Sequence, residues 1–167
     1  MKARDKIKAA VELRSLCEAL RQRGCRTVFT NGCFDLLHVG HIRYLEAARE
    51  LGDLLIVGVN TDASVRQIKG PLRPVMGEAD RSELVAALPC VDYVTLFDTP
   101  DPLLLIELLQ PDVLVKGADW AEEKIVGAEV VRRSGGRVAR IPLVPHTSTT
   151  GIIEQIVKRY GERPAVS

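Results

Sequence analysis

A chain of 167 residues with 46% apolar content is long enough to fold around one sizeable core, as a single globular domain does. Its 23 basic and 22 acidic residues nearly cancel, and aromatic residues make up only 4%, which argues against nucleic-acid binding. The four cysteines are scattered, and no apolar run approaches the roughly 20 residues of a membrane span. We therefore expect a reduced, cytoplasmic protein that binds neither nucleic acid nor membrane.

Short apolar runs alternate with segments of helical spacing along the chain. The runs predict five buried strands, at 26–29, 53–59, 92–96, 113–115 and 137–143. Helices are predicted at 5–23, 42–51, 63–68, 79–88, 101–109, 125–134 and after Ser148. This alternation favours an α/β fold, with an open parallel five-stranded Rossmann-like sheet and helices on both faces. We expect one domain over 1–167, with a core at about 26–160 and a frayed tail over 161–167.

The most distinctive stretch is residues 30–41, Thr-Asn-Gly-Cys-Phe-Asp-Leu-Leu-His-Val-Gly-His. It joins the first strand to a helix, and such turns are where open α/β sheets hold ligands. Gly32 allows the backbone to approach a ligand closely, and Gly40 leaves free N–H groups at the helix start open to phosphate oxygens. His38 and His41 are three residues apart, so both can point the same way from one helical turn. Together these features predict a polyphosphate site.

Several charged residues follow the second strand. Asp62 could either contact a ligand or cap the next helix, and the sequence leaves both open. Lys69 and Arg73 belong to a loop rich in Gly and Pro, and a mobile basic loop would suit phosphate groups. Arg81 lies in the first turn of a helix, where the dipole disfavours cations, so a functional role is indicated.

Two later segments also lie where ligands are expected. The run from Lys116 through Gly117 and Asp119 to Trp120 follows the fourth strand, and Trp120 could be a packing anchor or a wall against a base. Ser148 is a good N-cap for the last helix, but hydroxyls occupy four consecutive positions over 147–150, more than capping needs. This hydroxyl-rich helix start predicts a second phosphate clamp.

Residues 31–41 resemble the GxFDxxHxGH signature of the cytidylyltransferase-like nucleotidyltransferases, whose fold also carries the HIGH motif of class I aminoacyl-tRNA synthetases. The runs Val-Asn-Thr-Asp-Ala-Ser-Val, Lys-Gly-Pro-Leu-Arg-Pro-Val and Pro-Asp-Val-Leu-Val-Lys-Gly-Ala-Asp-Trp look like bacterial D-glycero-β-D-manno-heptose 1-phosphate adenylyltransferases. That activity is often one half of a two-domain protein with a sugar kinase, and this chain resembles the stand-alone form. The Ser-Thr-Thr at 148–150 is similar to the RTxGxSTT motif of cytidylyltransferases, with Leu143 in place of the Arg.

This resemblance implies transfer of AMP from ATP to heptose 1-phosphate, giving ADP-heptose and pyrophosphate. It implies that His38 and His41 contact the α-phosphate and the bridging oxygen, with Lys69 as a third catalytic group. The ATP-contacting residues it implies are Asn31, Gly32, Cys33, Phe34, Gly40, Lys116, Gly117, Asp119, Trp120, Ser148 and Thr149. The sugar phosphate is assigned to Asp35, Asp62, Arg73 and Arg81. Mg²⁺ is expected on the triphosphate rather than in a protein cage, and a homodimer is suggested by the family.

Three other functions remain possible on the sequence. A cytidylyltransferase acting on an alcohol phosphate keeps the chemistry and changes the substrates. A non-catalytic nucleotide-binding module would need the glycines but neither the paired histidines nor the second clamp. A fragment of a tRNA synthetase is disfavoured by the nearly neutral charge.

Overall fold

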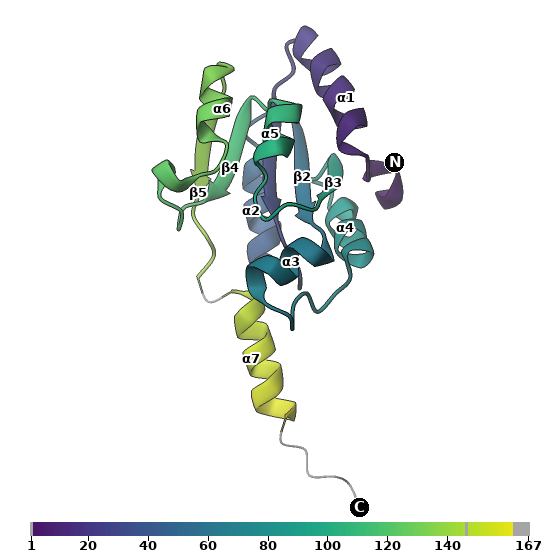
Figure 1. The fold of residues 1–167 in the computed structure, drawn as a ribbon, viewed down its shortest axis with the longest axis vertical. Helices are drawn as coiled ribbons and strands as arrows, with labels where there is room; N and C mark the ends of the chain where they lie inside the picture. The colour runs from purple at the N-terminus through teal and green to yellow at the C-terminus, as the bar shows by residue number, and fades with distance from the viewer. Residues whose placement is uncertain (1, 146, 162–167) are drawn as a thin grey trace, which may run out of the picture.

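The computed structural model describes residues 2–145 and 147–161, and a five-stranded sheet lies at its centre (Figure 1). The strands are β1 (Thr27–Gly32), β2 (Leu54–Asn60), β3 (Tyr93–Phe97), β4 (Val113–Gly117) and β5 (Arg137–Ile141). The α-helices are α1 (Ala10–Gln22), α2 (Val39–Arg49), α3 (Asp62–Lys69), α4 (Glu78–Ala87), α5 (Leu103–Leu109), α6 (Ala128–Arg133) and α7 (Thr149–Tyr160). Two short 3₁₀ helices, η1 (Ala3–Lys6) and η2 (Glu122–Lys124), complete the described elements.

The sheet has the strand order β3-β2-β1-β4-β5, and every neighbouring pair is parallel. The chain steps outward from β1 to β3 and then returns to the other side of β1 with β4. This reversal makes the carboxyl ends of β1 and β4 the topological switch point, where open α/β sheets bind ligands. The predicted parallel five-stranded Rossmann-like sheet is confirmed.

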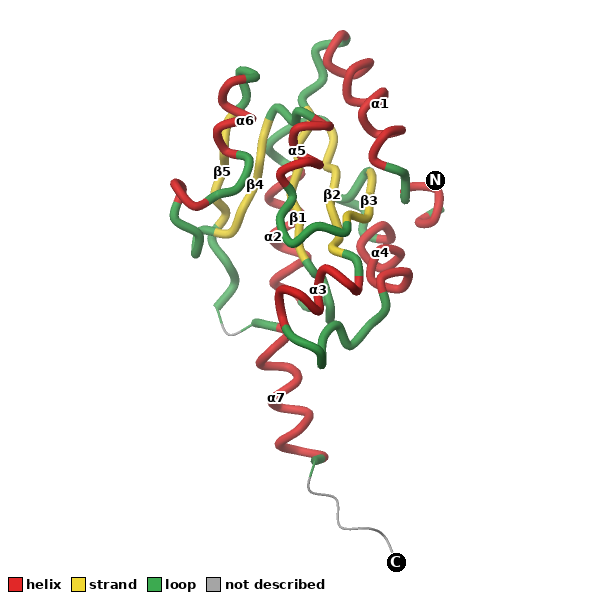
Figure 2. The backbone as a smooth tube through the Cα atoms, viewed as in Figure 1, coloured by secondary structure: helices red, strands yellow, loops and turns green. Residues whose placement is uncertain are grey.

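Each face of the sheet is covered by helices, as the tube in Figure 2 also shows. One core cluster joins α2 and α4 to one face, and the other joins α1, α5 and α6 to the opposite face. Successive side chains of β1 pack into different clusters, Val28 into the first and Phe29 into the second. Side chains alternate across a strand, so a strand buried on both faces must be apolar throughout.

The N-terminal segment differs from the predicted single helix over 5–23. The structure has η1, then an extended stretch, then α1, because Ile7 bridges to Val94 of β3 and the Lys8 amide donates to the Val94 carbonyl at 2.9 Å. Pairing with the sheet edge satisfies these backbone groups in place of a continuous helix.

α7 extends away from the sheet and its covering helices (Figure 1), and none of its residues is buried. Its apolar side chains Ile156, Val157 and Tyr160 are all more than half exposed. Among the described residues, no helix combines the length and apolar character needed to cross a membrane.

Arg81 of α4 is fully buried, and its guanidinium joins this helix to the loops after β1 and before α4, to the end of β2 and to the start of α3. Nε donates to the Met76 carbonyl at 2.9 Å, Nη1 to the Cys33 carbonyl at 2.5 Å, and Nη2 to the Asn60 carbonyl at 2.8 Å. Nη2 also pairs with the Asp62 carboxylate at 2.7 Å. A buried cation is tolerated here because every donor nitrogen has an acceptor.

We expect Arg81→Met to lower the free energy of unfolding by about 3 kcal/mol, because it leaves three carbonyls and a carboxylate without their donor. Urea denaturation measures this change. Arg4→Ala is the matched control, since it removes an exposed ion pair with Glu83 of the same helix (2.9 Å) and should cost less than about 1 kcal/mol. Equal losses in the two variants would contradict the structural role of Arg81.

Candidate functional site

A cavity of about 500 Å³ lies at the carboxyl ends of the strands, around the switch point between β1 and β4. It collects residues from β1, β4, both flanking loops and the starts of α2 and α7. Most of the residues predicted for the site line it, although they come from distant parts of the chain. These are Asn31, Gly32, Cys33, Phe34, Asp35, His38, Gly40, His41, Lys69, Arg73, Lys116, Gly117, Asp119, Trp120, Ser148 and Thr149.

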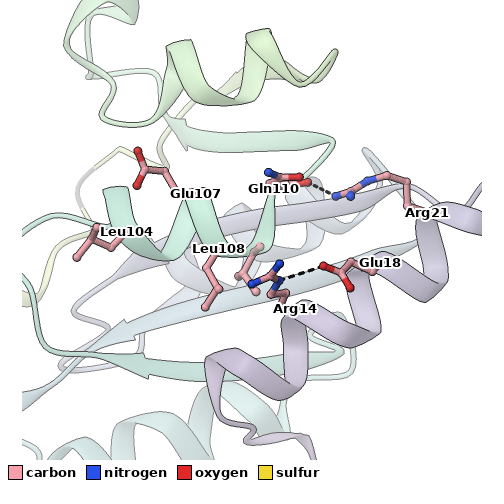
Figure 3. A pocket seen from close by; sticks show the side chains of 8 residues that line it. Arg14, Glu18, Arg21, Leu104, Glu107, Leu108 and Gln110 are labelled. Carbon is pink, nitrogen blue, oxygen red and sulfur yellow. Dashed lines mark hydrogen bonds and ion pairs between the residues drawn. The ribbon is translucent and has the colours of Figure 1, made fainter.

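A second hollow, of about 330 Å³, lies between α1 and α5 (Figure 3). Three of its charged side chains are paired with neighbours: Arg14 with Glu18 at 3.0 Å, and Arg21 with the Gln110 backbone carbonyl at 2.5 Å. The remaining lining residues are three leucines and Glu107. Neither histidines nor glycines line it, so the switch-point cavity is the candidate active site.

The two signature histidines form a stacked pair beside the start of α2. Their ring centroids are 3.9 Å apart and their planes are inclined by 22°, while the Phe34 ring centroid lies 5.3 Å from that of His41. Both Nδ1 atoms are buried and have no hydrogen-bond partner among the described residues. Burial lowers the pKa of His38, and burial together with the neighbouring His38 lowers the pKa of His41 to about 4. Both imidazoles are therefore neutral near pH 7 in the free protein.

Two helix starts meet at the cavity. His38 is the N-cap of α2, and α2 begins at Val39, three residues before the predicted start. A Cβ added at Gly40 would lie 2.5 Å from Thr147 Oγ1, so the segment before α7 rests directly on the first turn of α2. Thr149 Oγ1 also donates to the Leu36 carbonyl at 3.3 Å. The free N–H groups of both helix starts are thereby gathered at one end of the sheet.

Ser148 caps α7, since its hydroxyl accepts from the Gly151 amide at 3.0 Å. The predicted N-cap is therefore confirmed. Capping uses one lone pair of the hydroxyl, and the same side chain lines the cavity.

Asp35 holds the basic loop over the cavity. Its buried carboxylate accepts from Arg73 Nε at 2.5 Å and from the amides of Val75 and Met76 at 2.8 and 3.0 Å. Burial alone would raise the pKa of Asp35, but the Met76 and Val75 amides and the Arg73 guanidinium outweigh it and hold the pKa below its ordinary value. Asp35 is thus committed to anchoring this loop, which leaves Arg73 facing the cavity beside it.

Arg81 and Asp62 are not among the residues that line the cavity. The predicted contact of Arg81 with the sugar phosphate does not fit the structure, because its guanidinium is fully buried and bound to Asp62 and three carbonyls. Asp62 is the first residue of α3, whose N-cap is Thr61, so it does not cap the helix either. Asp62 lies in the first turn of α3 and pairs with the buried Arg81. The ion pair gives both residues a structural role.

The signature region also matches a known family. The family model described as cytidylyltransferase-like covers residues 29–155. The chain belongs to the cytidylyltransferase-like family. The bifunctional protein HldE of Syntrophotalea carbinolica is 55% identical over 93% of this chain and 32% of its own length. HldE of Geotalea uraniireducens is 58% identical over 90% of the chain and 31% of its own length. The chain therefore spans about a third of the length of these curated relatives.

A solved structure, that of the lipopolysaccharide core biosynthesis protein from Thermoplasma volcanium GSS1, is also similar. It is 29% identical with a TM-score of 0.61, and the match covers 74% of this chain and all of that one. This likeness supports the cytidylyltransferase-like assignment at the level of the fold.

The cytidylyltransferase-like site contains residues that sequence reasoning missed. Tyr44 lines the cavity one turn after His41, and its hydroxyl is 2.8 Å from Thr30 Oγ1. A second group follows β3, where residues 100–102 form part of the wall, although the sequence predicted only a helix over 101–109 and no site residue there. Their position at the carboxyl end of a strand was the available signal. Apolar wall residues are contributed by Ile68, Ile125, Val126, Leu143 and Val144.

Protein stability should fall in acid partly because of His41. Its pKa is about 4 in the folded protein against an ordinary value of 6.5, so below pH 6.5 the unfolded state takes up the proton first. The contribution of neutral His41 is full above pH 6.5 and is lost progressively down to about pH 4. We expect His41→Asn to flatten the decline in unfolding free energy over this window, as measured by urea denaturation at several pH values. Parallel curves for the two proteins would contradict this assignment.

Proposed function

We propose that this chain is a nucleotidyltransferase that moves AMP from ATP to D-glycero-β-D-manno-heptose 1-phosphate, releasing pyrophosphate. The observation that carries this proposal is the convergence of the histidine pair and two helix starts on one switch-point cavity. The motif resemblance supplies the substrates, and the HldE relatives at 55–58% identity support the same choice. The Thermoplasma neighbour is described as acting in lipopolysaccharide core biosynthesis, which is consistent with a heptose product.

In this reaction an oxygen of the sugar phosphate attacks the α-phosphorus of ATP. The new P–O bond forms as the bond from the α-phosphorus to the bridging oxygen breaks, and its electron pair leaves with pyrophosphate. No covalent enzyme intermediate is needed, so the protein must position the reactants and stabilise charge. We assign the N–H groups at the starts of α2 and α7 to the triphosphate, with Ser148 and Thr149 beside them.

His38 and His41 donate hydrogen bonds to the phosphates in this scheme. Even a neutral imidazole carries one N–H to donate, and the stacked pair lies beside the start of α2. A triphosphate close by would raise both pKa values, because an anion favours the imidazolium form. Proton uptake on nucleotide binding would then increase the charge that these rings offer to the leaving group.

We assign the nucleotide base to the wall formed by Gly117, Asp119 and Trp120 after β4. The acceptor would occupy the opposite side, near Asn60, Lys69 and Arg73, which line the same cavity from β2 and the following segment. Lys69 is exposed at the end of α3, so its ammonium can move over the bound phosphates.

Mg²⁺ is the metal that the family implies. Among the described residues no three His, Cys, Asp or Glu side chains are grouped as ligands, and the Asp35 carboxylate is saturated by its own donors. The donor set therefore fits a metal that takes most of its ligands from phosphates and water, with Asp119 lining the cavity nearby. When bound, Mg²⁺ would neutralise phosphate charge. We further propose that the enzyme works in the cytoplasm, and a homodimer remains an expectation from the family.

A panel of nucleotides and phosphate acceptors, read by pyrophosphate release, tests the proposal. We expect turnover with ATP and heptose 1-phosphate, and His41→Ala should reduce kcat by about 10²–10³-fold. Turnover with CTP and glycerol 3-phosphate instead would favour the alternative that the family name suggests. Nucleotide binding without any pyrophosphate release would identify a non-catalytic module.

Gly40→Ala should weaken ATP binding roughly tenfold or more, because its methyl group would meet Thr147 Oγ1 at 2.5 Å and the His38 ring at 3.0 Å. Calorimetric titration with ATP measures the change. Gly77→Ala is the matched control, since its methyl group would have only Asp62 Oδ2 within 4 Å, at 3.8 Å. If Gly40→Ala binds ATP as tightly as the control, the two helix starts do not form the clamp.

A further inference from the structure

Lys116 lies at the carboxyl end of β4, and its ammonium donates to the side-chain oxygen of Asn31 at the carboxyl end of β1. The two strands are direct neighbours, so this hydrogen bond spans the switch point itself. Both side chains line the cavity. Asn31 is neutral and uses only one of the three ammonium hydrogens, so the hydrogen bond leaves the positive charge uncompensated.

The other cations near the cavity are differently placed. Arg73 is paired with Asp35, and Arg81 is buried against Asp62 outside the lining. Lys69 is exposed, and both histidines are neutral near pH 7. Among the described lining residues, Lys116 is thus the partly buried cation with no acidic partner. A charge in such a position is stabilised when an anion binds beside it.

We propose that the Lys116 ammonium binds the phosphoryl group that is transferred, which makes Lys116 a catalytic residue of the reaction assigned above. The residue keeps its proton and forms no covalent bond. Its charge stabilises the non-bridging oxygens of the α-phosphate while the acceptor oxygen bonds to phosphorus and pyrophosphate departs. This inference rests on the proposed adenylyl transfer and gives Lys116 a role in the reaction beyond the ATP contact that the motif implied.

The charge on Lys116 should change between pH 6 and 10, the range over which the kinetics below are measured. Burial lowers the pKa of Lys116 to about 8, and the nearby Cys33 opposes this shift. The side chain is positively charged below that pH and loses its charge as the pH rises through it. A bound phosphate would raise the pKa again. Arg140 of β5 is paired with Lys116 in the strand register. The titratable and charged groups that share the cavity are Cys33, Asp35, His38, His41, Tyr44, Lys69, Arg73, Asp101 and Asp119.

Steady-state kinetics between pH 6 and 10 test the proposal on the wild-type, K116M and K116R proteins. We expect wild-type kcat/KM to fall above about pH 8, and kcat to fall at higher pH because the bound phosphate raises the pKa. K116M should lose about 100-fold in kcat and show no alkaline decline. K116R should keep part of the activity without that decline, because a guanidinium stays charged. A wild-type rate in K116M, or an unchanged alkaline decline in K116R, would overturn the proposal.

Binding of inorganic tripolyphosphate, measured by calorimetry at pH 7, provides a readout that needs no turnover. We expect K116M to bind it at least about tenfold more weakly than wild type, a loss of roughly 1.4 kcal/mol. K124M should bind normally, since Lys124 is exposed in η2 and outside the cavity lining. Weaker binding in K116M together with a wild type that transfers no AMP would uphold the phosphate site and refute the proposed function. Normal turnover and binding in K116M would refute the phosphate site at Lys116 and uphold the proposed function.

Discussion

The site depends on β1 having β2 on one side and β4 on the other. The chain leaves β1 in one direction, builds β2 and β3, and returns to place β4 at the free edge of β1. Helices that follow strands on opposite sides of this point cover opposite faces of the sheet, so the carboxyl ends of β1 and β4 are left open. The signature turn after β1 and the Lys116–Asn31 hydrogen bond both lie at that opening.

Burial sets the electrostatics around the opening. Asp35 and Arg81 keep their charges because backbone amides, carbonyls and an opposite charge surround each of them, and both are used to hold loops in place. Within the described part of the chain His38, His41 and Lys116 have no such partners, so burial lowers their pKa values and favours their neutral forms. The site thus contains groups that would gain charge on binding the proposed triphosphate, next to groups whose charges are already paired.

The proposed second phosphate clamp depends on a contact between distant parts of the chain. Gly40 accepts the close approach of Thr147, and Thr149 donates to the Leu36 carbonyl, although more than a hundred residues separate these segments. Apart from such contacts at its first turn, α7 stands away from the sheet and buries none of its residues. The position of the start of α7 is therefore set chiefly by the signature turn.

The sequence by itself determined the sheet and the signature turn, because apolar runs, glycines and paired histidines are local patterns with few structural solutions. It also identified most residues of the cavity, since the ends of parallel strands gather at one edge of a sheet. It did not distinguish Arg81 and Asp62 from the residues that line the cavity. In sequence, a charged residue that binds a ligand cannot be told from one that binds a buried partner. Only the tertiary structure decided that Asp35 anchors the basic loop, that residues 100–102 join the wall, and that Lys116 meets Asn31. These contacts depend on which polar groups are buried next to one another when the strands assemble. That is a property of the packed sheet rather than of any local segment.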